Sequence, residues 1–98
     1  MAESIQNDQW IWVVVQDPGG EEQFLGQEDE TTKVAFIPVF MEKEEAEAGL
    51  PFLSKDEARK YEVQAIRFDD LKSRLAETDF MVFVLSREGE VREKISPR

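Results

Sequence analysis

The stretch Trp10-Ile11-Trp12-Val13-Val14-Val15 (WIWVVV) is an unbroken run of aromatic and β-branched residues. Such a run is too short for a lone helix and is typical of a strand that is buried on both faces. It ends at Gln16-Asp17-Pro18-Gly19-Gly20, where Pro presets φ and Gly supplies a positive φ. We therefore predict a core strand over 10–15, then a turn and a short return strand over 23–26. Trp10 and Trp12 share one face of this strand, and we expect both to pack in the core.

Three further segments carry strand patterns. Phe80–Leu85 (FMVFVL) is a second fully apolar run, and the turn at 87–89 leads from it into a partner strand over 90–95. Val34–Phe40 (VAFIPVF) is also apolar, but Pro38 lacks an amide hydrogen, so this strand is expected at an edge or with a bulge. Tyr61–Phe68 (YEVQAIRF) is a weaker strand pattern because polar residues are interleaved in it.

The segments between these strands carry helix patterns. Residues 42–48 form a polar helical stretch that ends near Gly49 and Pro51. Ser54-Lys55-Asp56-Glu57 matches the capping box and predicts a short helix through about Lys60. Asp69 or Asp70 can cap a helix that runs to about Glu77, with Leu71 and Leu75 on one face.

Together these patterns predict an α+β fold with a single mixed β-sheet of five to six strands and two or three short helices. The 98 residues suit a single small domain over 1–98, with 1–8 and 96–98 as flexible tails. Short helices with narrow apolar stripes leave part of one sheet face uncovered. We expect a second copy of the chain to cover it, forming a homodimer.

Charge is divided unevenly along the chain. Residues 1–47 carry twelve acidic and two basic side chains, whereas residues 48–98 carry ten of each, so the net charge of −10 belongs to the first half. Direct binding of nucleic acid by the acidic half is disfavoured because phosphates would meet like charge. The chain contains no cysteine and no histidine, which excludes thiol nucleophiles, disulfides and imidazole-based triads. The polar, acidic start and the absence of a long apolar run predict no signal peptide, no membrane span and a cytoplasmic location.

The acidic segments are the clearest candidate site. They either keep a solvated surface soluble or form a docking face for a basic protein, which would gain from electrostatic steering. The residues of this candidate protein-binding face are Glu21, Glu22, Glu28, Asp29, Glu30, Glu42, Glu44 and Glu45.

Chemistry-bearing motifs are otherwise missing from the sequence. The run 28–30 offers carboxylates for calcium, but the spacing of a calcium loop is absent, so we expect no metal and no cofactor. No residue is assigned a catalytic role. The sequence thus favours a non-enzymatic interaction or structural module that self-associates. The alternative is a small-ligand binder or enzyme that uses carboxylates in a cleft near Asp17 and Asp69.

The order of elements over residues 34–91 resembles the N-terminal domain of the SseB-type (enhanced serine sensitivity) family. The residues that carry this resemblance are Phe36-Ile37-Pro38-Val39-Phe40, Glu42, Phe68, Leu71, Leu75, the run 80–85 and Gly89. The resemblance implies a small α/β domain that is often one module of longer proteins. It implies no catalytic residues.

Overall fold

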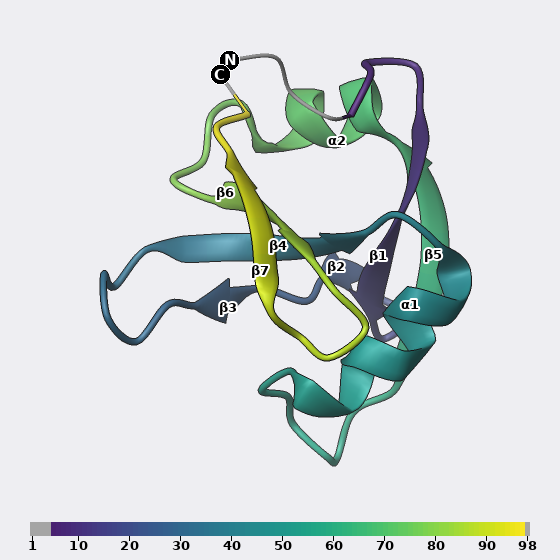
Figure 1. Ribbon diagram of the computed structural model, residues 1–98. Coiled ribbons are helices and arrows are strands. Elements are labelled where there is room, and N and C mark those ends of the chain that lie inside the picture. Colours follow the sequence, from purple (N-terminus) through teal and green to yellow (C-terminus); the bar gives the residue numbers. More distant parts are fainter. Residues whose placement is uncertain (1–4, 98) are drawn as a thin grey trace.

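A computed structural model describes residues 5–97, which form one mixed sheet with helices on both faces (Figure 1). The strands are β1 (Trp10–Gln16), β2 (Gln23–Phe24), β3 (Gln27–Glu28), β4 (Ala35–Phe40), β5 (Tyr61–Arg67), β6 (Met81–Leu85) and β7 (Val91–Ile95). The helices are α1 (Lys43–Gly49), the single 3₁₀ turn η1 (Leu50–Phe52) and α2 (Phe68–Leu75). No helix among residues 5–97 is long and apolar enough to cross a membrane.

The predicted α+β fold with one mixed sheet is confirmed, although the described strands number seven rather than five or six. The difference arises in 23–28, where β2 falls within the return strand expected over 23–26 and β3, at 27–28, is an additional strand that was not predicted. Strand β2 pairs with β1, and β3 pairs with β4. The parallel pair in the sheet is β4 with β6, and the other pairings are antiparallel.

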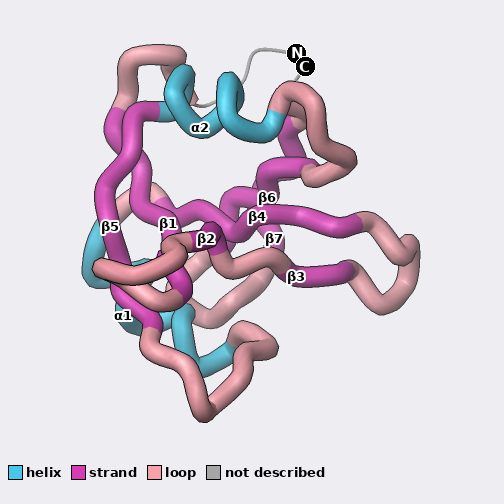
Figure 2. Tube along the Cα trace, turned by 180° about the vertical axis from the view of Figure 1, so that it is seen from behind, coloured by secondary structure: helices cyan, strands magenta, loops and turns pink. Residues whose placement is uncertain are grey.

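Strand β1 organises one half of the sheet. Along one side it pairs with β5 over all seven residues, from Trp10 opposite Arg67 to Gln16 opposite Tyr61. Its other side is shared by β4 and β2. Consequently β5 forms the outer margin of this half, as the front and rear views both show (Figures 1 and 2).

Each face of the sheet packs against its own helix. Phe68, Leu71 and Leu75 of α2 join Ile11, Val13 and other buried residues in one core cluster. On the opposite face Ala46 of α1 joins a second cluster with Val14, Phe40 and Phe83. Gly49 lies against Phe40 here, and a Cβ at this position would be 2.5 Å from Phe40 Cε1, so the end of α1 approaches the sheet closely.

The expectation that Pro38 marks an edge or a bulge is wrong. Strand β4 lies inside the sheet, with β6 along one side. On its other side, Phe36 pairs with β3 and Val39 pairs with β1. Pro38 falls where this partner changes, so an interior strand tolerates a residue without an amide hydrogen.

The helix expected over 54–60 does not form. The amide of Ser54 donates to Gln27 Oε1 at 2.8 Å, and its carbonyl accepts from Gln27 Nε2 at 2.6 Å. Asp56 accepts from the amide of Ala58 in a local turn instead of entering a helix. Because Ser54 is held by β3, this long-range contact overrides the local capping pattern.

Two boundary expectations also need correction. Arg67, rather than Asp69 or Asp70, is the N-cap of α2, and both aspartates lie in its first turn. Residues 5–8 are not a tail, because Ile5 is 3% exposed in the core and the Asn7 carbonyl accepts from the Asp69 amide. The remainder of the predicted N-terminal tail, and Arg98 of the C-terminal one, lie outside the described residues.

The prediction that Trp10 and Trp12 both pack in the core is wrong. Trp10 is 59% exposed, at the end of β1. Trp12 is half-buried, and Lys43 of α1 lies 5.8 Å from the centroid of its ring. The core of this strand is instead built from its aliphatic residues Ile11, Val13, Val14 and Val15.

Candidate functional site

The outer edge of β5 presents free backbone groups. The Asp17 amide donates to the Lys60 carbonyl at 2.8 Å, and the Phe68 amide donates to the Gln9 carbonyl at 2.9 Å. Antiparallel strands exchange such bonds at every second pair. The alternate residues of β5 therefore direct their backbone groups away from β1, and these are Tyr61, Val63, Ala65 and Arg67.

No other described strand pairs with β5. The Arg67 carbonyl begins the hydrogen bonding of α2, as expected of an N-cap residue. The remaining outward groups are the amides of all four residues and the carbonyls of the first three. An unpaired row of this kind is a template for another strand.

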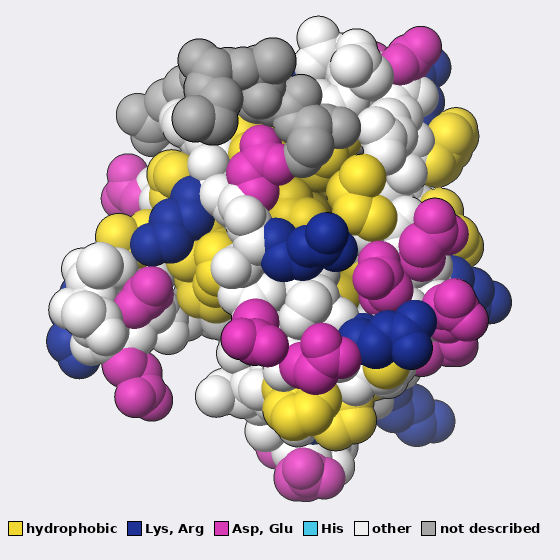
Figure 3. Space-filling view, viewed as in Figure 1, with side chains coloured by type: hydrophobic (Ala, Val, Ile, Leu, Met, Phe, Trp, Pro, Cys, Tyr) yellow, Lys and Arg dark blue, Asp and Glu magenta, His cyan; other side chains and the backbone are white. Residues whose placement is uncertain are grey.

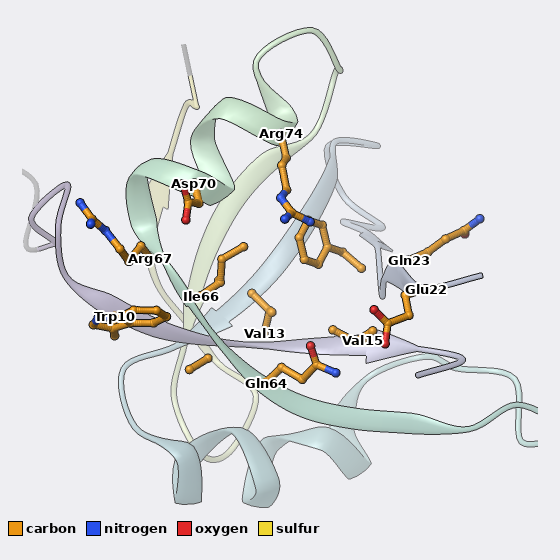
Figure 4. Close-up of a pocket in the computed structure, with 12 residues that line it drawn as sticks. Trp10, Val13, Val15, Glu22, Gln23, Gln64, Ile66, Arg67, Asp70 and Arg74 are labelled. Atoms are coloured by element: carbon orange, nitrogen blue, oxygen red, sulfur yellow. The ribbon is translucent and has the colours of Figure 1, made fainter. Parts of the chain in front are cut away.

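A hollow lies beside this edge, on the face of the sheet that α2 covers only in part (Figure 4). Its volume is about 410 Å³. Val13 and Val15 of β1 form part of its floor, and Gln64 and Ile66 of β5 form the wall nearest the free edge. Phe24 of β2 also lines the hollow, so it adds apolar surface, with Val13 and Val15, to a lining whose exposed surface is otherwise mainly polar.

Charged side chains surround the hollow. Arg74 reaches down from α2, with its guanidinium carbon 5.9 Å from the centroid of the Phe24 ring. Arg67 Nη2 donates to Asp69 Oδ2 at 2.8 Å, and its Nε is buried without a hydrogen-bond partner among the described residues. Asp70 and Glu22 bring carboxylates to the same rim. Two arginines and two carboxylates line the hollow, which therefore has no strong net charge.

The candidate acidic residues do not form one face. Glu21 and Glu22 lie between β1 and β2, Glu28 ends β3, and Asp29 and Glu30 belong to the β3–β4 loop. Glu42, Glu44 and Glu45 lie at the start of α1. The β3–β4 loop and α1 are on opposite sides of the molecule (Figure 1). Basic side chains are interspersed with the acidic ones on the surface in Figure 3.

Local contacts explain part of this acidic set. The amides of Thr31 and then Thr32 donate to Asp29 Oδ1 at 2.9 and 3.3 Å, and these bonds lower the pKa of Asp29. Lys94 contributes a smaller attraction to the same carboxylate. Glu44 lies 3.8 Å from Arg87 Nη2. These acids thus have partners within the chain.

The alternative cleft near Asp17 and Asp69 is also wrong as a single site. Asp17 follows the end of β1 and pairs with Arg59. The Asp69 amide bonds to Asn7, before the start of β1. The length of the seven-residue strand, about 20 Å, separates them. Within the described part of the chain, no three carboxylates are placed to hold a metal ion.

No protein-family model, no curated protein and no solved structure matches this chain. The resemblance to SseB-type domains therefore stays a prediction. The sequence pattern predicted a strand over 61–68, and the structure has it at 61–67. The pattern did not predict the free edge or the hollow, because both depend on the pairing of β1 with β5.

Proposed function

We propose that this chain is a non-enzymatic protein-interaction module that binds an extended polypeptide segment along the free edge of β5. The observation that carries the proposal is the row of outward amides and carbonyls on Tyr61, Val63 and Ala65. A segment that added to this edge would bond to them as a further strand of the sheet.

The hollow supports the same function. It lies beside the edge, so alternate side chains of an added segment would extend toward Gln64 and Ile66. Main-chain bonds then supply affinity, and the mixed polar and apolar lining of the hollow supplies a preference for the side chains that reach it. Both features belong to one continuous surface.

The acidic docking face is a weaker basis for binding. Its candidate residues are distributed over separate segments, and Asp29 and Glu44 have partners within the chain. The net charge of −10 still attracts basic proteins over distance. We therefore assign specificity to the β5 edge and only long-range attraction to the charge.

Ala65→Pro is the substitution that tests this proposal. The Ala65 amide points outward, so proline removes a bond to an added strand but none to β1. Ala65 is exposed, and Ala65→Val keeps the amide while adding a side chain that suits strands. This second variant is the matched control.

A displayed library of random peptides would be panned against the wild-type chain alone, so that the selection itself does not discriminate against Ala65→Pro. Fluorescence anisotropy of the labelled winners gives the affinities. We expect equal binding to the wild type and Ala65→Val, and binding at least about tenfold weaker to Ala65→Pro. Winners that bind all three proteins equally, or a library with no winners, would refute the proposed function.

Cytoplasmic location belongs to the same proposal, because an acidic chain without cysteine suits a reducing compartment. Cell fractionation with an antibody against the chain tests it. Recovery with the membranes or outside the cell would contradict it.

A further inference from the structure

We propose that the segment bound along β5 is β5 of a second copy, in an antiparallel pair whose two-fold axis passes between the Gln64 residues of the two copies. This inference rests on the proposed function and names its partner. The pair would join the two sheets into one, with the same face of each copy on the same side.

Backbone geometry restricts the register. Opposite residues in an antiparallel pair place their side chains on the same face, and residues with outward backbone groups must meet each other. A register centred on Gln64 satisfies both conditions and uses all seven residues of the strand. It places Val63 opposite the partner's Ala65, and Tyr61 opposite the partner's Arg67. The neighbouring registers that satisfy both conditions are centred on Val63 or on Ala65, and each pairs fewer residues of the strand.

Side-chain chemistry favours the same register. Tyr61 meets a guanidinium, which suits the face of its ring. Glu62 meets the partner's Ile66, and Gln64 meets its own copy, so no like charges stand opposite each other. One alternative register would place Arg59 opposite the partner's Arg67, which is unfavourable.

The hollow gains from this arrangement. Gln64 and Ile66 form its wall nearest the edge, so the wall of each copy would continue into that of the other. The two hollows would then form a single trough across the axis, with the two Gln64 amides at its centre. At present the Gln64 amide donates within its own strand to Glu62 Oε1 at 2.8 Å.

Charge opposes the pair at long range but little at the edge itself. Two copies that each carry −10 repel one another, and Glu44, Glu45 and Glu47 of α1 add to this on one face. Strand β5 contains one acid and one base, Glu62 and Arg67, and is neutral. The second copy therefore approaches along a neutral edge of an acidic molecule.

Sedimentation velocity from about 5 to 500 µM measures the association, for which we expect Kd of roughly 10–100 µM because one strand pair is a small interface. We expect the wild type and Ala65→Val to form dimers, and Ala65→Pro to stay monomeric with an unchanged circular dichroism spectrum. A wild type that is monomeric at 500 µM, or an Ala65→Pro variant that dimerises equally, would overturn the inference.

Single cysteines test the register even if Ala65→Pro does not fold, since the natural chain contains none. Facing Cβ atoms in the central pair lie about 5 Å apart, near the range of a disulfide. Gln64→Cys should therefore form a disulfide-linked dimer under mild oxidation. Glu62→Cys alone and Ile66→Cys alone should not, because each is about 13 Å along the strand from its own copy. A mixture of these two variants should cross-link.

The possible results separate the two proposals. If selected peptides need the Ala65 amide but the chain is monomeric and Gln64→Cys does not cross-link, β5 binds another protein and the second copy is excluded. If no peptide binding depends on the Ala65 amide and the chain does not dimerise through β5, the proposed function is refuted as well. Cross-linking of Glu62→Cys alone in place of Gln64→Cys would refute the register.

Discussion

Two of the longer strands at the margins of the described sheet, β5 and β7, differ in how they are protected. Strand β7 has three consecutive charged residues, Arg92, Glu93 and Lys94, and its register with β6 shifts near Leu85. Strand β5 pairs with β1 over seven residues without any shift in register, and its middle residues Val63–Ile66 carry no charge. Charges and bulges are the common means by which sheets prevent edge pairing. From this comparison we predict that the β7 edge resists further strands and that the β5 edge accepts them.

The two strands also differ in how they are anchored. Strand β5 runs directly into α2, whose first residue, Phe68, is completely buried. Strand β7 begins at Val91, which is 45% exposed. Strand β5 is thus anchored through the first residue of α2, whereas Val91 contributes little to the anchoring of β7, which depends on Ile95 at its other end, 2% exposed in the core.

The largest expected effect concerns this anchoring. Phe68→Ala removes a buried ring that packs with Leu71 and Leu75, and should lower the free energy of unfolding by about 3–5 kcal/mol. Val91→Ala should change it by less than about 0.5 kcal/mol, because its side chain is already half in solvent. Urea denaturation followed by circular dichroism gives both values. Similar losses for the two variants would contradict the difference in anchoring.

The second prediction opens the protected edge. Arg92→Thr combined with Glu93→Thr replaces two charges by a residue that suits strands, leaving Lys94 over the Phe83 ring. Molecules with two open edges should assemble beyond dimers, and light scattering should show the average mass rising with concentration. Adding Ala65→Pro should limit this assembly to dimers through β7. A double variant that behaves as the wild type would show that these charges do not protect the edge.

The strongest local patterns in the sequence predicted the sheet correctly. The runs 10–15 and 80–85 are apolar enough to require cover on both faces, and both became interior strands. Helix α2 was predicted from Leu71 and Leu75, which do lie in the core. Such features depend on neighbours in the chain, and short-range periodicity is sufficient to find them.

Features that depend on distant pairs were not predicted. Gln27 holds Ser54 from a different strand, so the capping pattern at 54–57 had no helix to cap. Pro38 lies in an interior strand because, along one side of β4, the pairing changes from β3 at Phe36 to β1 at Val39. The acidic segments were expected to form one face but are separated by the strands between them. The open edge of β5 follows from its pairing with β1, which no local pattern encodes.

The third prediction concerns ionic strength. If the second copy occupies β5, added salt screens the repulsion between two chains of charge −10, and the dimer should tighten by a few-fold between about 0.05 and 0.3 M NaCl. A basic partner attracted by the same charge should show the opposite trend. Sedimentation velocity across this range of salt measures the change in Kd.

A triple variant tests the source of the repulsion. Glu44→Gln with Glu45→Gln and Glu47→Gln should reduce the salt response, because α1 then contributes less repulsion. A dimer that weakens with salt would contradict this account of its charge.

The smallest effect on dimerisation is expected from a substitution at Asp29, on the side of the molecule away from β5. The Thr31 and Thr32 amides lower the pKa of Asp29 in the folded chain, so its carboxylate stabilises the β3–β4 loop above the pKa of the unfolded state. This contribution is lost as the pH falls through the lower, folded pKa. Carboxyl titration by NMR should give Asp29 a pKa below 3.8, its ordinary value, and Asp29→Asn should remove that signal. At neutral pH Asp29→Asn should leave dimerisation almost unchanged, because the loop lies across the sheet from the open edge (Figure 1). A clear loss of dimer on this substitution would place the interface at the acidic loop instead of β5.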